Sequence, residues 1–133
     1  VVLVGPTEIP KFKHDRLEYV GRVPKDEVGS WIASFDVCLY PFKKSSFLDT
    51  INPVKIYEYL AQNKPIIAVK SKETERFCSK IALYDNYKQL EALLITDIKA
   101  PFSSEQEVRL FMMENNWEYR CKEILEEIRH GNS

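Results

Sequence analysis

Residues 52–69 read NPVKIYEYLAQNKPIIAV, which predicts a short helix followed at once by a buried strand. Asn52 suits the cap of the helix, because its side-chain oxygen can accept an unpaired N–H of the first turn. Pro53 suits the first helical position, where no N–H donor is needed. Asn63 tolerates the left-handed conformation in which helices commonly end, and Pro65 prevents continuation. The apolar run after Pro65 is typical of a strand covered on both faces.

The predicted helix has two different faces. The i, i+3, i+4 and i+7 positions of a core-facing side are occupied by Ile56, Tyr59, Leu60 and Asn63. Lys55, Glu58 and Gln62 share another face. That polar face has two readings. Lys55 and Glu58 could form a solvated ion pair worth about 0.2–0.5 kcal/mol, or Glu58 could accept hydrogen bonds from the hydroxyls of a ligand.

Composition places the chain among ordinary single globular domains. It has 133 residues, of which 44% are hydrophobic and 29% charged, and its net charge is −1. Such a charge gives no general attraction to nucleic acid, and no apolar run approaches the roughly 18 residues of a membrane span. The cysteines lack metal-ligand spacing and fit a reducing compartment. We therefore expect a cytoplasmic domain over residues 1–133, with no metal, no nucleic-acid partner and no transmembrane segment.

Apolar runs alternate with helical patterns along the whole chain. Strands are predicted at residues 1–5, 17–20, 36–40, 66–69 and 81–84. Helices are predicted to begin near Pro24, Asn52, Lys72 and Asn86, and a long closing helix to run from about 103 to 129. This alternation indicates an α/β fold, a Rossmann-like parallel sheet with helices on both faces. Because the first residues already form a core strand, we expect the domain to be truncated at its N-terminus.

The chain lacks the glycine-rich turn that usually cradles a phosphate. Its four glycines stand at positions 5, 21, 29 and 131, so a dinucleotide fingerprint or a P-loop is not encoded. In open parallel sheets, ligands bind outside the carboxyl ends of the strands. The helix that begins near Asn52 opens at that edge, where its N–H groups and dipole favour an anion by about 0.3–1 kcal/mol. A ligand that joins an anionic group to a polyol would fit there.

Four segments together resemble the group 1 glycosyltransferases of the GT-B fold. Residues 53–68 resemble the family's P-x-K-x-x-E-Y-L-A-x-G-K-P-V-V segment. Residues 19–28 (YVGRVPKDEV) resemble its G-x-v-p-x-x-e-l turn, and residues 36–42 (DVCLYPF) its D-v-x-l-x-P strand. Residues 114–120 (ENNWEYR) resemble the N-x-W-x-x-R start of its closing helix. The segments follow the family's order and span most of the chain.

This resemblance implies the carboxyl-terminal half of a two-domain enzyme, starting at the second strand of that half. Such a half holds a nucleotide-sugar donor, and an amino-terminal domain, absent here, holds the acceptor. The implied reaction moves a hexosyl unit from a nucleoside-diphosphate sugar to a hydroxyl in polysaccharide or glycoconjugate synthesis, without a cofactor or a metal. Any catalytic base would lie in the absent domain, so the catalytic residues are unknown and the isolated chain should be inactive. The implied location is the cytoplasm, at the inner face of the membrane if the absent half makes a peripheral contact.

The resemblance also assigns donor-binding residues. Glu58 matches the glutamate that accepts hydrogen bonds from the ribose hydroxyls, and Lys55 adds a positive charge nearby. Arg22 and Val23 lie where the family contacts the nucleobase. The backbone expected to meet the diphosphate or the donor sugar comprises Ile51, Asn52, Pro53 and Val54.

The sequence departs from the family pattern at one donor position. Many members carry an E-x7-E pair whose first glutamate would fall on Thr50, and the adjacent Asp49 could substitute for it. Asn63 replaces the glycine that commonly follows the helix, a mild change because asparagine tolerates the left-handed conformation.

Two other functions fit the same fold. A sugar-nucleotide epimerase would need acids and histidines in its cleft, and the two histidines here, His14 and His130, stand alone. A binding or assembly module without chemistry would fit the loss of a glutamate at Thr50. Lys43 and Lys44 read first as solvated loop residues, and an acceptor or lipid phosphate is the alternative. Glu73 and Glu75 follow the strand at 66–69, where they could reach a donor.

Overall fold

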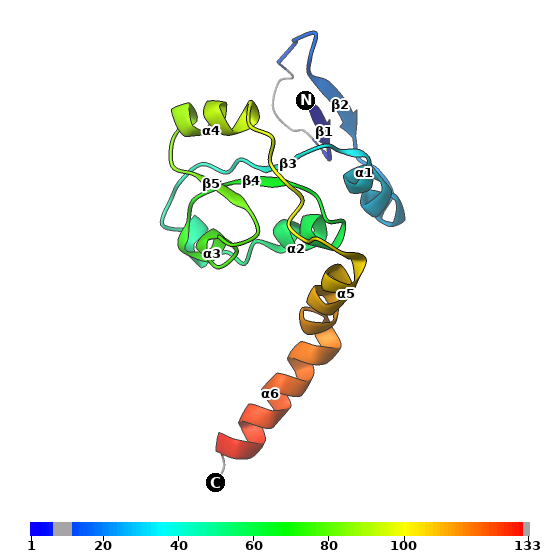
Figure 1. Ribbon diagram of the computed structural model, residues 1–133, viewed down its shortest axis with the longest axis vertical. Helices are drawn as coiled ribbons and strands as arrows, with labels where there is room; N and C mark the ends of the chain where they lie inside the picture. The colour runs from blue at the N-terminus through cyan, green and yellow to red at the C-terminus, as the bar shows by residue number, and fades with distance from the viewer. Residues whose placement is uncertain (7–11, 132–133) are drawn as a thin grey trace.

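The computed structural model shows an α/β fold with two small parallel sheets (Figure 1). It describes residues 1–6 and 12–131. The first sheet pairs β1 (Val2–Val4) with β2 (Glu18–Gly21). The second sheet has the order β3-β4-β5, from β3 (Cys38–Tyr40), β4 (Ile66–Val69) and β5 (Ala82–Tyr84). Every pairing is parallel, as the sequence predicts.

Helices cover both faces of the three-stranded sheet. The short 3-10 turns are η1 (Lys25–Glu27) and η2 (Leu48–Thr50). The α-helices are α1 (Val28–Ser34), α2 (Val54–Ala61), α3 (Lys72–Glu75), α4 (Tyr87–Leu94), α5 (Glu105–Glu114) and α6 (Trp117–Gly131). In Figure 1, α4 lies on one side of this sheet and α2 and α3 lie on the other, while α6 extends away from the body of the protein.

The core is centred on β4 and α2. All four residues of β4 are buried, because the strand has a neighbour on each edge and a helix on each face. Ile56 and Leu60 of α2 have no exposed surface, so the predicted apolar face of this helix is confirmed. Burying a side chain of this size contributes about 1.5–3 kcal/mol. The local sequence signals and the packing thus agree on the element that organises the domain.

The prediction of one continuous sheet, beginning with a buried strand, is wrong. β1 pairs with β2 but with no strand of the second sheet. Val1, Val2 and Leu3 are exposed, because among the described residues β1 is hydrogen-bonded along one edge only and lies outside the main core. An apolar strand is therefore present where the sequence places it, without the cover that the sequence pattern implies.

The predicted cap of α2 is also wrong by one residue. Pro53 occupies the cap position and α2 begins at Val54, with no side chain bonded to the first turn. The N–H of Val54 donates to the carbonyl of Asn52 at 2.9 Å, so the backbone of Asn52 takes the place of its side chain. The predicted left-handed stop is confirmed, since Asn63 has φ +50°.

The predicted closing helix from 103 to 129 is interrupted. Ser104 caps α5 by accepting the N–H of Glu107, but α5 ends at Glu114. Asn116 then accepts the N–H of Tyr119 at 2.8 Å and starts α6. Asparagine side chains compete with helical backbone hydrogen bonds in this way, so one predicted helix becomes two.

Candidate functional site

The candidate site lies at the carboxyl edge of the three-stranded sheet. Three segments leave the strands at this edge: residues 41–53 after β3, 70–71 after β4 and 85–86 after β5. They meet because the three strands are parallel and end on the same side. The first of these segments leads into α2, so the opening turn of α2 lies at this edge too.

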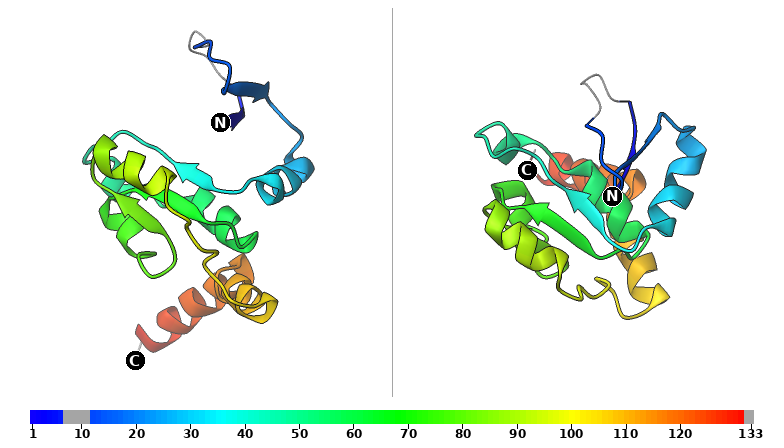
Figure 2. Two further views of the ribbon diagram at one scale, coloured as in Figure 1. Left: turned by 45° about the horizontal axis from the view of Figure 1, so that its top comes forward. Right: turned by 90° about the horizontal axis from the view of Figure 1, so that it is seen from above.

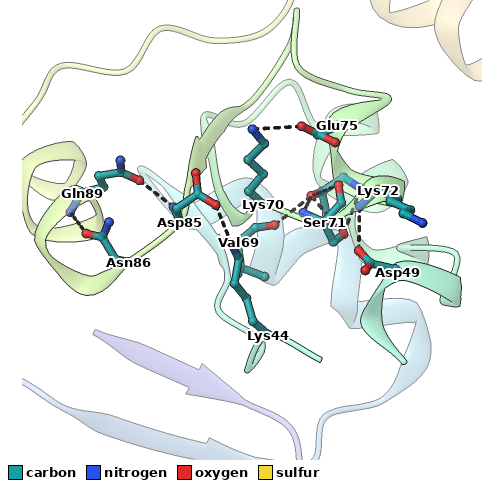
Figure 3. A network of polar contacts seen from close by, with 11 residues as sticks. Lys44, Asp49, Val69, Lys70, Ser71, Lys72, Glu75, Asp85, Asn86 and Gln89 are labelled. Atoms are coloured by element: carbon teal, nitrogen blue, oxygen red, sulfur yellow. Dashed lines mark hydrogen bonds and ion pairs between the residues drawn. The ribbon is translucent and has the colours of Figure 1, made fainter. Parts of the chain in front are cut away.

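Polar contacts join the three segments, as Figure 3 shows. Lys44, from the first segment, forms an ion pair with Asp85 after β5, and this pair lowers the pKa of Asp85. The Nζ of Lys70 lies 3.0 Å from Oε1 of Glu75, whose carboxylate raises the pKa of Lys70. The edge therefore has two carboxylates that each already hold a lysine.

Asp49 has a structural partner at this edge. Its Oδ1 accepts the backbone N–H of Lys72 at 2.9 Å, so it bonds to the first turn of α3 (Figure 3). Thr50 is likewise engaged, because its hydroxyl donates to the carbonyl of Phe47 at 2.8 Å. Neither of these side chains forms a hydrogen bond with Glu58. Asp49, which is expected near the donor sugar, thus connects η2 to α3, and Thr50 bonds back to the residue that precedes η2.

The opening of α2 carries a close ion pair. Nζ of Lys55 lies 2.6 Å from Oε2 of Glu58, and the two side chains are 53% and 38% exposed. A pair this exposed stabilises a protein by about 0.2–1 kcal/mol. The exposed ion pair that the sequence suggested between Lys55 and Glu58 is therefore present. It leaves Oε1 of Glu58 without a hydrogen-bond donor among the described residues.

Two backbone donors are free at this opening. Pro53 has no N–H, and the N–H of Val54 is used by the carbonyl of Asn52. The N–H groups of Ile51 and Asn52 have no acceptor within residues 1–6 and 12–131. Of the four backbone positions predicted to meet a diphosphate, two can therefore donate to an anion without losing a bond.

Gln62, at the end of α2, lies beside α1. A Cβ placed on Gly29 of α1 would lie 3.5 Å from Nε2 of Gln62, which shares a face with Lys55 and Glu58. Helix α2 also packs against β3, the outer strand of its sheet. The Lys55–Glu58 pair therefore lies on a helix that packs against β3, and among the described residues β3 pairs with β4 alone.

The nucleobase residues are not joined to this face. Arg22 is exposed and Val23 half-buried, both in the segment between β2 and η1. No hydrogen bond or ion pair connects either of them to α2 in the part of the chain that the structure describes.

Two hollows lie near the sheet, and neither includes Lys55 or Glu58. One, of about 510 Å³, is lined by residues that include Lys70, Glu75, Cys78, Asp85 and Gln89. The other, of about 280 Å³, lies between the end of α2 and α5. Sequence reasoning considered Glu75 but missed Lys70 and Asp85. Their signal was available, because each directly follows a predicted strand at its ligand-facing end.

Metal ligands and cysteine thiols are further candidate groups among the described residues. No cluster of three or more histidine, cysteine or acidic side chains is placed to hold a metal ion within residues 1–6 and 12–131. Cys38 is buried, and this burial raises the pKa of its thiol to about 11, so it stays protonated at neutral pH. Within the same ranges, no helix is long and apolar enough to cross a membrane.

Comparisons with protein-family models, with curated proteins and with solved structures found no match to this chain. The residues of the carboxyl edge and of α2 are therefore the basis on which a function can be proposed.

Proposed function

We propose that this chain is the donor-binding domain of a GT-B glycosyltransferase, which transfers a hexosyl unit from a nucleoside-diphosphate sugar to a hydroxyl acceptor. One observation carries the proposal. The segment that resembles the family's donor-binding segment forms a helix whose first turn opens at the carboxyl edge of a parallel sheet, with Lys55 and Glu58 at its start. The acceptor and the catalytic base would come from a second domain, and the reaction would take place in the cytoplasm.

The strand pairing supports a Rossmann-like sheet of this kind. A doubly wound sheet commonly has the order 3-2-1-4-5-6. If β1 to β5 are strands 2 to 6 of such a sheet, strand 2 must pair with strand 3, and strands 4, 5 and 6 must follow one another. These are the observed pairings, β1 with β2 and β3-β4-β5. The order has room for one more strand between β1 and β3, and such a strand would cover the exposed apolar residues of β1.

The position of the polar face of α2 fits this sheet. Ligands of doubly wound sheets bind where the strand order reverses, here beside the free edge of β3. Lys55 and Glu58 lie on the helix that follows β3 and packs against it. A donor bound there would meet both side chains, without needing either hollow described above.

The chemistry required is modest, because the main barrier is the departure of a charged diphosphate. Backbone N–H groups and a cation aimed at the developing charge stabilise such a leaving group. Ile51 and Asn52 supply two free N–H groups, and Lys55 supplies the cation. Glu58 would accept hydrogen bonds from the ribose hydroxyls through Oε1, the oxygen that Lys55 leaves free.

Calorimetric titration of the chain with UDP, GDP and ADP tests the proposal. At least one of them should bind, and Glu58→Gln should weaken that binding by about 1.5–3 kcal/mol, the usual value of a hydrogen bond to a charged group. Glu118→Gln is the matched control, because Glu118 also pairs with a lysine, Lys122 at 3.1 Å, but lies on α6, which does not follow a strand of the carboxyl edge. Binding that Glu58→Gln leaves unchanged, or no binding of any of the three, would show the proposal to be wrong.

A further inference from the structure

Helix α6 carries an exposed apolar stripe along one face. Trp117, Ile124 and Ile128 are 82%, 57% and 56% exposed, and Cys121 is exposed as well. These four residues, which we call the α6 stripe, follow one another at steps of four, three and four positions, so they share a face of the helix. Figure 1 and the left-hand view of Figure 2 show α6 projecting from the body of the protein. The stripe is therefore open to a partner, and exposed apolar surface of this kind usually marks a contact.

Two residues of opposite charge flank the α6 stripe on one side. Arg120 lies beside Cys121 and Glu127 lies beside Ile128, and the two charges are seven residues apart, which is close to two helical turns. Neither of them forms an ion pair within the part of the chain that the structure describes. The guanidinium of Arg120 lies 5.2 Å from the ring centroid of Tyr57, and a guanidinium over a ring keeps N–H donors at its edge. The stripe thus has a cation near its start and an anion near its end.

The other side of the stripe adds no unpaired cation. It holds Leu125, which is 53% exposed, and Glu118, which pairs with Lys122 at 3.1 Å. Over the whole of α6, four glutamates stand against three lysine and arginine residues, so the helix has no cationic surface for an anionic bilayer. A protein surface with the reversed order of charges fits better. A second copy of α6 that runs in the opposite direction has this order.

An antiparallel pair of α6 helices fills every layer of the stripe. When Trp117 lies opposite Ile128 of the second copy, Cys121 lies opposite Ile124, and the same contacts recur on the other side of the two-fold axis. In this register Arg120 lies beside Glu127 of the second copy, and this contact also occurs twice. Sliding one helix by seven residues would bring Arg120 against Arg120, or Glu127 against Glu127. A parallel pair would place neither charge beside its opposite, so the charges select the antiparallel register.

We propose that two copies of this chain associate through their α6 stripes in antiparallel orientation, with two ion pairs between Arg120 and Glu127. This inference does not depend on the proposed glycosyl transfer. The segment from Trp117 to Ile128 is about 17 Å long, so the interface is at the small end of specific protein contacts. We therefore expect reversible association with a dissociation constant on the order of 10 µM, and dilute samples should contain monomers.

Sedimentation equilibrium of the chain at roughly 1 to 500 µM tests the proposal and should show monomers in equilibrium with dimers. Ile124→Gln should raise the dissociation constant at least about tenfold, because it places a polar group at the centre of the stripe. Arg120→Glu and Glu127→Arg should each raise it about tenfold, because each brings like charges together at both contacts.

An equimolar mixture of Arg120→Glu and Glu127→Arg gives the sharpest result. Each contact between the two variants joins opposite charges, so the mixture should dimerise about as tightly as the unmodified chain. Loss of the contact between Arg120 and Tyr57 would not be repaired by mixing, because the variant chain still lacks the guanidinium. Rescue therefore separates an interface between copies from a role of Arg120 within one chain.

Two matched variants keep the test specific. Glu126→Arg reverses a charge on the face of α6 opposite the stripe, and Ile95→Gln replaces a 90% exposed side chain at the end of α4. Both should dimerise like the unmodified chain, and circular dichroism should show that every variant is folded. A chain that stays monomeric at about 500 µM, or dimers that Ile124→Gln leaves intact, would overturn the proposal. So would a mixture that fails to associate, since the stripe would then be covered by another partner, such as the absent acceptor domain.

Discussion

Asn63 holds the backbone of Phe102 with two hydrogen bonds. The N–H of Phe102 donates to Oδ1 of Asn63 at 2.9 Å, and Nδ2 of Asn63 donates to the carbonyl of Phe102 at 3.1 Å. The same asparagine ends α2 with φ +50°. Phe102 is buried and its ring lies 5.3 Å from that of Phe111 in α5. One side chain therefore ends α2 and fixes the segment that leads to α5.

This double contact predicts that Asn63→Gly destabilises the protein. Glycine accepts the left-handed conformation at no steric cost, so the loss would come from the two part-buried hydrogen bonds to the backbone of Phe102. We expect the free energy of unfolding to fall by about 1–3 kcal/mol, measured by urea denaturation. Asn63→Ala should cost roughly 1 kcal/mol more, because alanine resists a positive φ. A glycine variant as stable as the unmodified protein would show that the contacts with Phe102 contribute nothing.

The buried face of α2 predicts a steep difference between two neighbouring apolar positions. Leu60 has no exposed surface, whereas Val54 is more than half exposed. Leu60→Ala should lower the free energy of unfolding by about 2–5 kcal/mol, because it leaves a cavity in the core. Val54→Ala should change it by less than about 0.5 kcal/mol. Similar losses at the two positions would contradict the orientation of the helix.

Glu58 should matter little for stability. Its pair with Lys55 is well exposed, so Glu58→Gln should lower the free energy of unfolding by no more than about 1 kcal/mol. Thermal melting in the absence of nucleotide measures this directly. A loss of several kcal/mol would mean that the carboxylate is a structural group, and weaker nucleotide binding by the variant would then have a simpler cause.

The α2–β4 unit could be predicted from sequence because its signals are local. Residues 54–69 contain a helical apolar period, a left-handed stop and an apolar run, and each produces the expected structure in place. The break after Glu114 was also encoded locally, by two adjacent asparagines, but their capping potential competes with a strong helical pattern on both sides. Where a capping signal and a helical pattern are of similar strength, the sequence does not show which of them determines the structure.

Long-range relationships could not be predicted in the same way. The apolar run at β1 indicates a strand, but its exposure depends on which strands lie beside it. The partner of Asn63 lies 39 residues away and presents only its backbone, which has no sequence signature. Asp49 looked like a donor ligand because of its place in a motif, and its bond to the N–H of Lys72 is visible only in three dimensions.

The far part of α6 should be dispensable for folding. Every described side chain from residue 121 to 130 is exposed, whereas the guanidinium of Arg120 lies 5.2 Å from the ring centroid of Tyr57. Removal of residues 121–133 should therefore change the free energy of unfolding by less than about 1 kcal/mol. Arg120→Ala in the full chain should cost about 0.5–1 kcal/mol, the value of a partly exposed cation–π contact. A truncated chain that fails to fold would show that α6 packs on the domain in solution.

Burial of Cys38 and Tyr59 predicts a loss of stability at alkaline pH. Burial raises the pKa of the Cys38 thiol from 9.0 to about 11, and it raises the pKa of the Tyr59 hydroxyl from 10.0 to about 12. Both groups remain protonated in the folded protein at a pH where the unfolded chain already loses those protons. The unfolded state therefore binds fewer protons, and stability must fall as the pH rises from about 9 toward 11 and beyond. Each group should contribute on the order of 2 kcal/mol to that fall.

Urea denaturation at pH 7, 9, 10 and 11 separates the two contributions. Cys38→Val removes the buried thiol, so in this variant the decline should begin about one pH unit later, when Tyr59 starts to ionise in the unfolded chain. Cys78→Val is the control, because Cys78 is exposed and its removal should leave the decline of the unmodified protein intact. If Cys38→Val and the unmodified protein lose stability over the same pH range, the thiol of Cys38 is accessible to water. The core around β3 would then be more open than its burial indicates.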